Sequence, residues 1–171
     1  MKLLKTIILS VALISLFSCS ERLSPKRSDA GQQQVKQQVV KLLEEEYKQP
    51  FELESFDYEY KTQYPNASGN KPYTTFGVFN FKIKAINNPV IIMDFDFRDD
   101  KKDSIKSLIE SFKKTQLKIA YCVALTRYYK NLKATDELKQ PYVSEAEKIC
   151  NKLDKTDYLF YKKWYLKHQT N

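Results

Sequence analysis

Residues that could carry out catalysis are scarce in this chain of 171 residues. His168 is the only histidine and lies close to the C-terminus, and the chain holds only 3 glycines. A histidine-based catalytic triad, a histidine-rich metal site or a glycine-rich phosphate loop therefore has almost no material. The sequence assigns no catalytic residue, no metal site and no cofactor, and it favours a non-catalytic role.

The densest carboxylate cluster is the stretch DFDFRDDKKD, residues 94–103. A calcium loop needs oxygen ligands at alternate positions and a glycine at its sharp turn. Arg98 occupies the third alternate position and the stretch has no glycine, so the calcium interpretation fails. We instead predict that Asp94 faces Lys82 across two strands. The remaining carboxylates would favour the N-terminus of a following helix: Asp99, Asp100 and Asp103.

The densest aromatic stretch is YLFYKKWYLKH, residues 158–168. Aromatic rings beside lysines can stack on sugars, contact another protein or lie at lipid headgroups. Such a stripe can equally be the docked face of a terminal helix. Because one apolar stripe spans only part of a helix circumference, we expect some rings to remain exposed and to form a binding surface. The candidates are Tyr158, Tyr161, Trp164 and Tyr165.

The N-terminus has the layout of a signal peptide. Lys2 and Lys5 precede an apolar run, residues 7–17, that is too short to cross a ~30 Å hydrocarbon core as a helix. The run ends in Leu16-Phe17-Ser18-Cys19, which resembles the lipobox of bacterial lipoproteins. This resemblance covers about the first twenty residues only, and the family of the remaining chain is not recognised.

The lipobox resemblance implies that residues 1–18 are removed and that Cys19 carries acyl chains. Two or more chains would hold the protein on a membrane, since each buried methylene contributes ~0.8 kcal/mol. Ser20 stands where an aspartate would resemble an inner-membrane retention signal. The expected location is therefore the outer membrane, on its periplasmic face or at the cell surface.

Export also bears on the two other cysteines, Cys122 and Cys150. Disulfides persist outside the cytosol, so the pair is a candidate bridge that would close a loop of about thirty residues. The alternative is two buried free thiols that pack as small hydrophobic groups.

Charge and length limit the remaining choices. The mature 153 residues suit one domain and carry 27 basic against 21 acidic side chains. Outside the cytosol this positive charge predicts no nucleic-acid partner. The partners that remain compatible with this positive charge are lipid headgroups, an anionic glycan or an acidic protein.

The hydrophobic patterns predict an α+β fold in one domain, residues 35–171, after a flexible tether at residues 19–34. An N-terminal helix from Val35 is followed by an antiparallel meander of three or more strands. Alternating apolar residues predict a hairpin from 79–85 and 91–97. Two or three C-terminal helices would pack on the sheet. One is long and runs from Ser104 to Val123, and another begins at a capping box formed by Ser144 and Glu147.

Three classes of function remain from these patterns. The first is a lipid-anchored envelope protein that acts as a binding or accessory module, including an inhibitor or immunity protein for another protein. The second is a binder of a small ligand or glycan with an aromatic pocket. The third is a small hydrolase that uses two carboxylates. An exposed apolar patch would favour the binding module. A cavity lined by aromatic rings would favour the ligand or glycan binder, and two close buried carboxylates would favour the hydrolase.

Overall fold

A three-stranded antiparallel sheet forms the centre of the computed structural model, which describes residues 26–63, 74–99, 104–151 and 157–169. The strands are β1 (Phe51–Gln63), β2 (Thr74–Ala85) and β3 (Ile92–Asp99), in the order β1-β2-β3. Phe81 pairs with Phe95 and Lys82 with Asp94, which confirms the predicted register of the hairpin. The α+β class is confirmed: among the described residues, one helix precedes the sheet and the other helices follow it.

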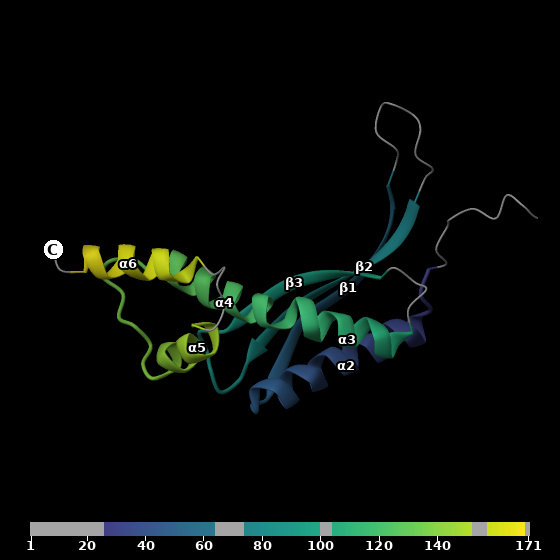
Figure 1. The fold of residues 1–171 in the computed structure, drawn as a ribbon, viewed down its shortest axis with the longest axis horizontal. Helices are drawn as coiled ribbons and strands as arrows, with labels where there is room; N and C mark the ends of the chain where they lie inside the picture. The colour runs from purple at the N-terminus through teal and green to yellow at the C-terminus, as the bar shows by residue number, and fades with distance from the viewer. Residues whose placement is uncertain (1–25, 64–73, 100–103, 152–156, 170–171) are drawn as a thin grey trace, which may run out of the picture.

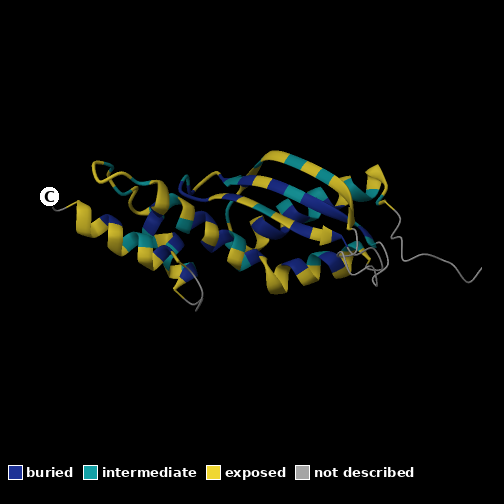
Figure 2. Cartoon of the chain, turned by 90° about the horizontal axis from the view of Figure 1, so that it is seen from above, coloured by how far each residue is buried: buried dark blue, intermediate teal, exposed yellow. Residues whose placement is uncertain are grey.

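The two faces of the sheet differ in burial because successive side chains of a strand point to opposite sides. The inner face is apolar, and its central members are fully buried: Phe79, Phe81, Ile83, Met93 and Phe97. The outer face is exposed and charged (Figure 2). Lys82 pairs there with Glu54 at 2.9 Å and Arg127 of the neighbouring helix with Asp94 at 3.3 Å.

Helices α2 (Asp29–Tyr47), α3 (Ile105–Thr115) and α4 (Leu117–Asn131) lie along the inner face of the sheet (Figure 1). The single long helix predicted from Ser104 is divided, because Gln116 leaves the helical conformation with φ −126°. The break at Gln116 rotates the buried stripe of the following helix. Leu117 and Tyr121 are therefore buried, whereas Ile119 and Val123 are exposed. Helical spacing continued from Ile105 and Leu108 would place residues 119 and 123 on the buried stripe, and this expectation is wrong.

The N-terminal helix begins earlier than predicted. Ser28 caps α2 by accepting a hydrogen bond from the Gly31 amide at 3.2 Å, and residues 29–34, assigned to the flexible tether, are helical. Glutamine is a good helix former, so low apolar content alone was a poor guide there. Residues 19–25 of the predicted tether, with Cys19, lie outside the described residues.

Two short helices extend the fold beyond the sheet: α5 (Tyr142–Cys150) and α6 (Tyr158–His168). A disulfide joins Cys122 of α4 to Cys150 of α5, with Cα atoms 5.5 Å apart. The predicted capping box is wrong because α5 begins at Tyr142, behind Pro141. Ser144 instead donates to the Gln140 side chain at 2.7 Å, and Glu147 faces α4 and α6.

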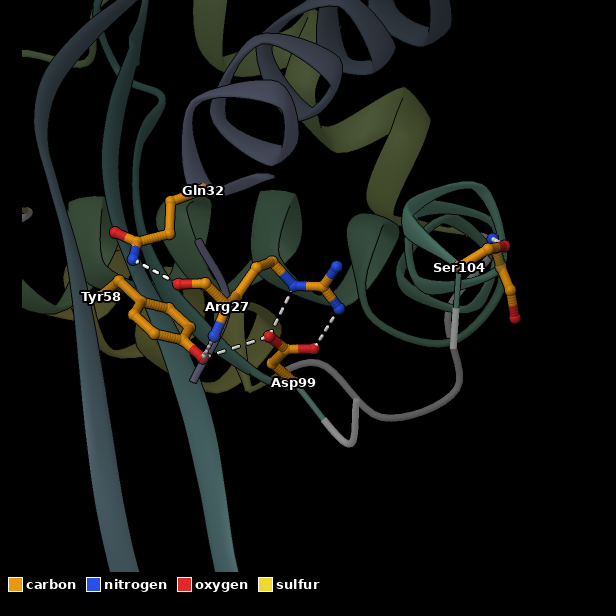
Figure 3. A network of polar contacts seen from close by, with 6 residues as sticks. Arg27, Gln32, Tyr58, Asp99 and Ser104 are labelled. Atoms are coloured by element: carbon orange, nitrogen blue, oxygen red, sulfur yellow. Dashed lines mark hydrogen bonds and ion pairs between the residues drawn. The ribbon is translucent and has the colours of Figure 1, made fainter. Parts of the chain in front are cut away.

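A buried ion pair fastens the segment before α2 to the end of β3 (Figure 3). The Arg27 guanidinium donates from Nε and Nη2 to the two oxygens of Asp99, at 2.7 and 2.5 Å. Asp99 has no exposed side-chain surface and Arg27 has 14%. We call these two residues and Tyr58 the N-terminal clamp. The clamp corrects the prediction that Asp99 serves the N-terminus of the following helix, where Ser104 is the N-cap; Asp100 and Asp103 lie outside the described residues.

Tyr58 of β1 completes the N-terminal clamp. Its hydroxyl donates to Asp99 and accepts from the backbone amide of Arg27, each at 3.2 Å. Burial is the main reason why the pKa of Tyr58 is raised. Its ring lies over Gly77 of β2, where a Cβ atom would come within 2.1 Å of the Tyr58 hydroxyl oxygen. Gly77 is therefore a steric requirement of the clamp.

Candidate functional site

Helix α6 is the part of the fold where predicted binding residues and exposed apolar surface coincide. It packs beside α4 at one end of the elongated molecule, and the N-terminal clamp lies at the other end (Figure 1). At about 100° per residue, Tyr158, Tyr161 and Tyr165 fall on one side of α6. These three tyrosines form its docked face: Tyr158 and Tyr165 are buried and Tyr161 is half-buried.

The binding-surface prediction is therefore wrong for Tyr158 and Tyr165. Their rings are 1% and 0% exposed, and their hydroxyls have partners inside the protein. Tyr158 donates to the Asn151 side chain, and Tyr165 donates to the carbonyl oxygen of Asp136. The spacing of three tyrosines at i, i+3 and i+7 was a signal in the sequence for this docked face.

A polar network holds α6 against α4 and α5. The Glu147 carboxylate of α5 accepts a hydrogen bond from the Tyr129 hydroxyl at 2.5 Å and pairs with the Lys162 ammonium at 2.7 Å. Burial, and then the contact with Glu147, raise the pKa of Tyr129. The Tyr129 ring stacks on Tyr158 with centroids 6.3 Å apart. We call Tyr129, Glu147 and Lys162 the α6 network.

The opposite side of α6 exposes large apolar side chains to solvent. Phe160 is 67% exposed and Trp164 is 46% exposed, one helical turn apart. Lys163 and Lys167 separate this pair from two exposed leucines on the other flank of the helix, Leu159 and Leu166. We call these four apolar residues and Lys163 the α6 exposed face. Of the four predicted binding residues, only Trp164 lies on it; Phe160, Leu159 and Leu166 were missed.

The Trp164 ring is fixed by a neighbour. The His168 ring stacks on it with centroids 4.3 Å apart, and His168 Nδ1 lies 2.7 Å from the Trp164 carbonyl oxygen. Phe160 lies edge-on to Tyr161 at 5.3 Å. A ring that is already positioned loses less conformational entropy when a partner covers it. The α6 exposed face is therefore partly preorganised for contact.

An open cleft of about 810 Å³ lies between β3, α4 and residues 132–139. Its charged lining residues are of both signs, and Tyr128 is the only aromatic ring among the described residues that line it. Two of these charged residues, Lys82 and Arg127, already pair with Glu54 and Asp94. The cleft thus lacks the aromatic walls expected of a glycan site, and nothing in its chemistry selects a ligand.

Carboxylate and metal chemistry find little support in the described ranges. The one buried carboxylate there, Asp99, is neutralised by Arg27. No group of three metal-ligating side chains occurs among the described residues. Nor does any described helix combine the length and the apolar content that crossing a membrane requires.

Comparisons of the chain with models of protein families, with curated proteins and with solved structures give no match.

Proposed function

We propose that this protein is a lipid-anchored binding module of the cell envelope that contacts another protein through the α6 exposed face. The observation that carries the proposal is the exposure of four large apolar side chains on an 11-residue helix whose other side is docked. Several exposed large apolar side chains on one short helix favour an interaction surface over a purely solvated one. The lipobox-like residues 16–19 and the signal-peptide layout before them support the anchor.

The charges on α6 indicate the chemistry of the protein partner. Lys163 lies between the two apolar flanks, and the chain as a whole carries a formal net charge of +8. A complementary surface would present carboxylates beside an apolar groove, as in the binding of an amphipathic helix to a groove. Aromatic residues such as Trp164 often contribute most of the affinity in such contacts. An inhibitor or immunity protein that covers a second protein is one form of this role.

The two other classes have weaker support. A glycan binder would stack sugars on several rings, and the described lining of the cleft offers Tyr128 alone. A carboxylate hydrolase would need two acids that face a substrate together, and the buried Asp99 is occupied by Arg27.

The anchor is tested by the intact mass of the protein extracted from membranes. We expect a chain that begins at residue 19 and carries added acyl mass, and we expect Cys19→Ala to release the domain or to stall its processing. A soluble product that is cleaved elsewhere and lacks lipid would refute the anchor.

The binding face is tested by photo-crosslinking in intact cells. A photoreactive phenylalanine analogue replaces Phe160 in one variant and Ile86, which is 53% exposed at the end of β2, in the control. The proposal predicts a defined protein adduct from position 160 that is absent from position 86 and is weakened by Lys163→Glu. Equal adducts from both positions, or none from position 160, would contradict the proposal.

A further inference from the structure

Burying the ion pair of the N-terminal clamp costs desolvation energy, so a gain in stability alone does not explain why the pair is present. A fully buried carboxylate must lose its hydration, and replacing a buried ion pair with apolar residues is often neutral or stabilising. Arg27 and Asp99 are nevertheless paired through two hydrogen bonds, and Tyr58 and Gln32 position the same segment. Gln32 does so by donating to the Arg27 carbonyl oxygen at 2.9 Å. These contacts hold the backbone at Arg27 against β1, β3 and the first turn of α2.

The clamp lies at the N-terminal limit of the described residues. Arg27 is the second described residue, and eight residue steps separate it from Cys19. Those steps span at most about 28 Å when fully extended. A lipid at Cys19 would therefore keep the clamp within that distance of the bilayer.

The clamp and α6 lie at opposite ends of the molecule (Figure 1). Ile105, the first residue of α3, lines the same small pocket as Arg27 and Asp99. Tyr129, near the end of α4, stacks on the first residue of α6. The 24 residue steps from Ile105 to Tyr129 give α3 and α4 a combined length of at most about 36 Å, because Gln116 separates the two helices, and Trp164 lies about 9 Å along α6 from Tyr158.

The broad outer face of the sheet offers anionic headgroups little attraction. Its exposed acids on β1 and β3 are matched by bases such as Lys82 and Lys84, which pair with Glu54 and Glu52. Lying flat on the bilayer through this face would gain no electrostatic energy from such a balanced surface.

We propose that the Arg27–Asp99 pair is the joint that connects the lipid anchor to the folded domain, and that it makes α6 the membrane-distal end. The inference rests on the proposed anchor at Cys19. It deepens the proposed function by placing the protein partner on the side of the domain that faces away from the bilayer.

The experiment uses full-length lipidated protein reconstituted into vesicles of phosphatidylcholine and phosphatidylglycerol. Flotation with the vesicles tests the anchor first, so a failure of the proposed function is seen separately. Trypsin is then added, and the N-terminus of each released product is read by mass spectrometry. Because the clamp holds the Arg27 side chain, we expect products that begin at Leu23 or, after cleavage at the exposed Lys26, at Arg27, and none that begins at Ser28.

Asp99→Asn should open the joint without leaving a buried charge, because the Arg27 side chain can turn into solvent. We expect cleavage after Arg27 to become at least ten times faster in this variant, and Asp57→Asn, at an exposed position of β1, to leave it unchanged. Near-ultraviolet circular dichroism verifies the fold, and Tyr58→Phe is the milder second variant. Equal cleavage after Arg27 in the parent protein and Asp99→Asn would overturn the joint.

The same vesicles test the position of α6, because Trp164 is the only tryptophan in the chain. Brominated lipids quench tryptophan only on contact. The inference predicts that brominated acyl chains leave Trp164 emission unquenched while the protein floats with the vesicles. Strong quenching would show that α6 lies on the bilayer and would overturn the distal position.

Discussion

Each end of the molecule holds a terminal segment with one carboxylate, one cation and one tyrosine hydroxyl, but the two arrangements differ in burial. In the N-terminal clamp the Asp99 side chain is 0% exposed and receives two hydrogen bonds from a planar guanidinium. In the α6 network the Glu147 side chain is 16% exposed and meets the single ammonium of Lys162. Removing one partner of a buried ion pair greatly lowers the free energy of unfolding, whereas removing one partner of a partly exposed pair lowers it little. The first described residues are held by a buried ion pair, whereas α6 is docked mainly through tyrosine packing, which leaves the other side of α6 apolar and exposed.

The largest expected effect comes from leaving the Asp99 carboxylate buried without its cation. Arg27→Met should lower the free energy of unfolding by about 3–5 kcal/mol. The double variant Arg27→Met/Asp99→Leu should recover most of this loss, because no charge is then buried. Urea denaturation of the two variants measures both values. A single variant as stable as the parent protein would mean that the pair is not buried in solution.

The disulfide at the α6 end should have the next largest effect. Replacing Cys122 and Cys150 with serine should cost about 3–4 kcal/mol, because the bridge closes a loop with a sequence separation of 28. Non-reducing peptide mapping should recover the two cysteines in one linked peptide. If both thiols are alkylated in the unfolded, unreduced protein, the bridge is absent from the exported form.

The register of the hairpin could be predicted from the sequence because its information is local, although β2 begins at Thr74, before the predicted residue 79. Alternation from Phe79 to Ala85 and from Ile91 to Phe97 fixes both the buried face and the pairing, since a shift by one residue would expose every aromatic ring. The α+β class followed from the same patterns. Helix α2 could have been extended upstream by the Ser28 cap and the glutamines that follow it.

The clamp and the α6 exposed face depend on contacts between distant residues. Arg27 and Asp99 are 72 positions apart, and Arg27 lies in a segment whose composition predicted a tether. The exposure of Phe160 depends on which side of α6 meets α4, and that choice is made by Tyr129 and Glu147. Likewise the irregular residue Gln116, which rotates the stripe of α4, has no signature that helical periodicity could detect.

A smaller effect tests the steric part of the clamp. Gly77→Ala should cost about 1–3 kcal/mol, as overpacking does, because the new methyl group would displace the Tyr58 ring from Asp99. In the background of Tyr58→Ala the same substitution should be nearly neutral. A double-mutant cycle in thermal denaturation measures this coupling, and additive losses would argue against it.

The smallest effect is expected where the cation is partly exposed. Lys162→Gln removes a positive charge whose side chain is 31% exposed, so the loss should stay within about 1 kcal/mol. Urea denaturation beside Arg27→Met compares the two ends directly. A loss as large as that of Arg27→Met would remove the contrast between the α6 network and the clamp.

The most direct test of the central claim is hydroxyl-radical footprinting of Trp164 in three preparations: purified protein, vesicles reconstituted from it, and native membranes. Tyr60 of β1, which is 39% exposed, is the internal reference. If a protein partner covers the α6 exposed face, Trp164 should be oxidised at least three times more slowly in native membranes than in the two other preparations, with Tyr60 unchanged. Equal oxidation of Trp164 in all three preparations would contradict the claim that this face is a binding surface.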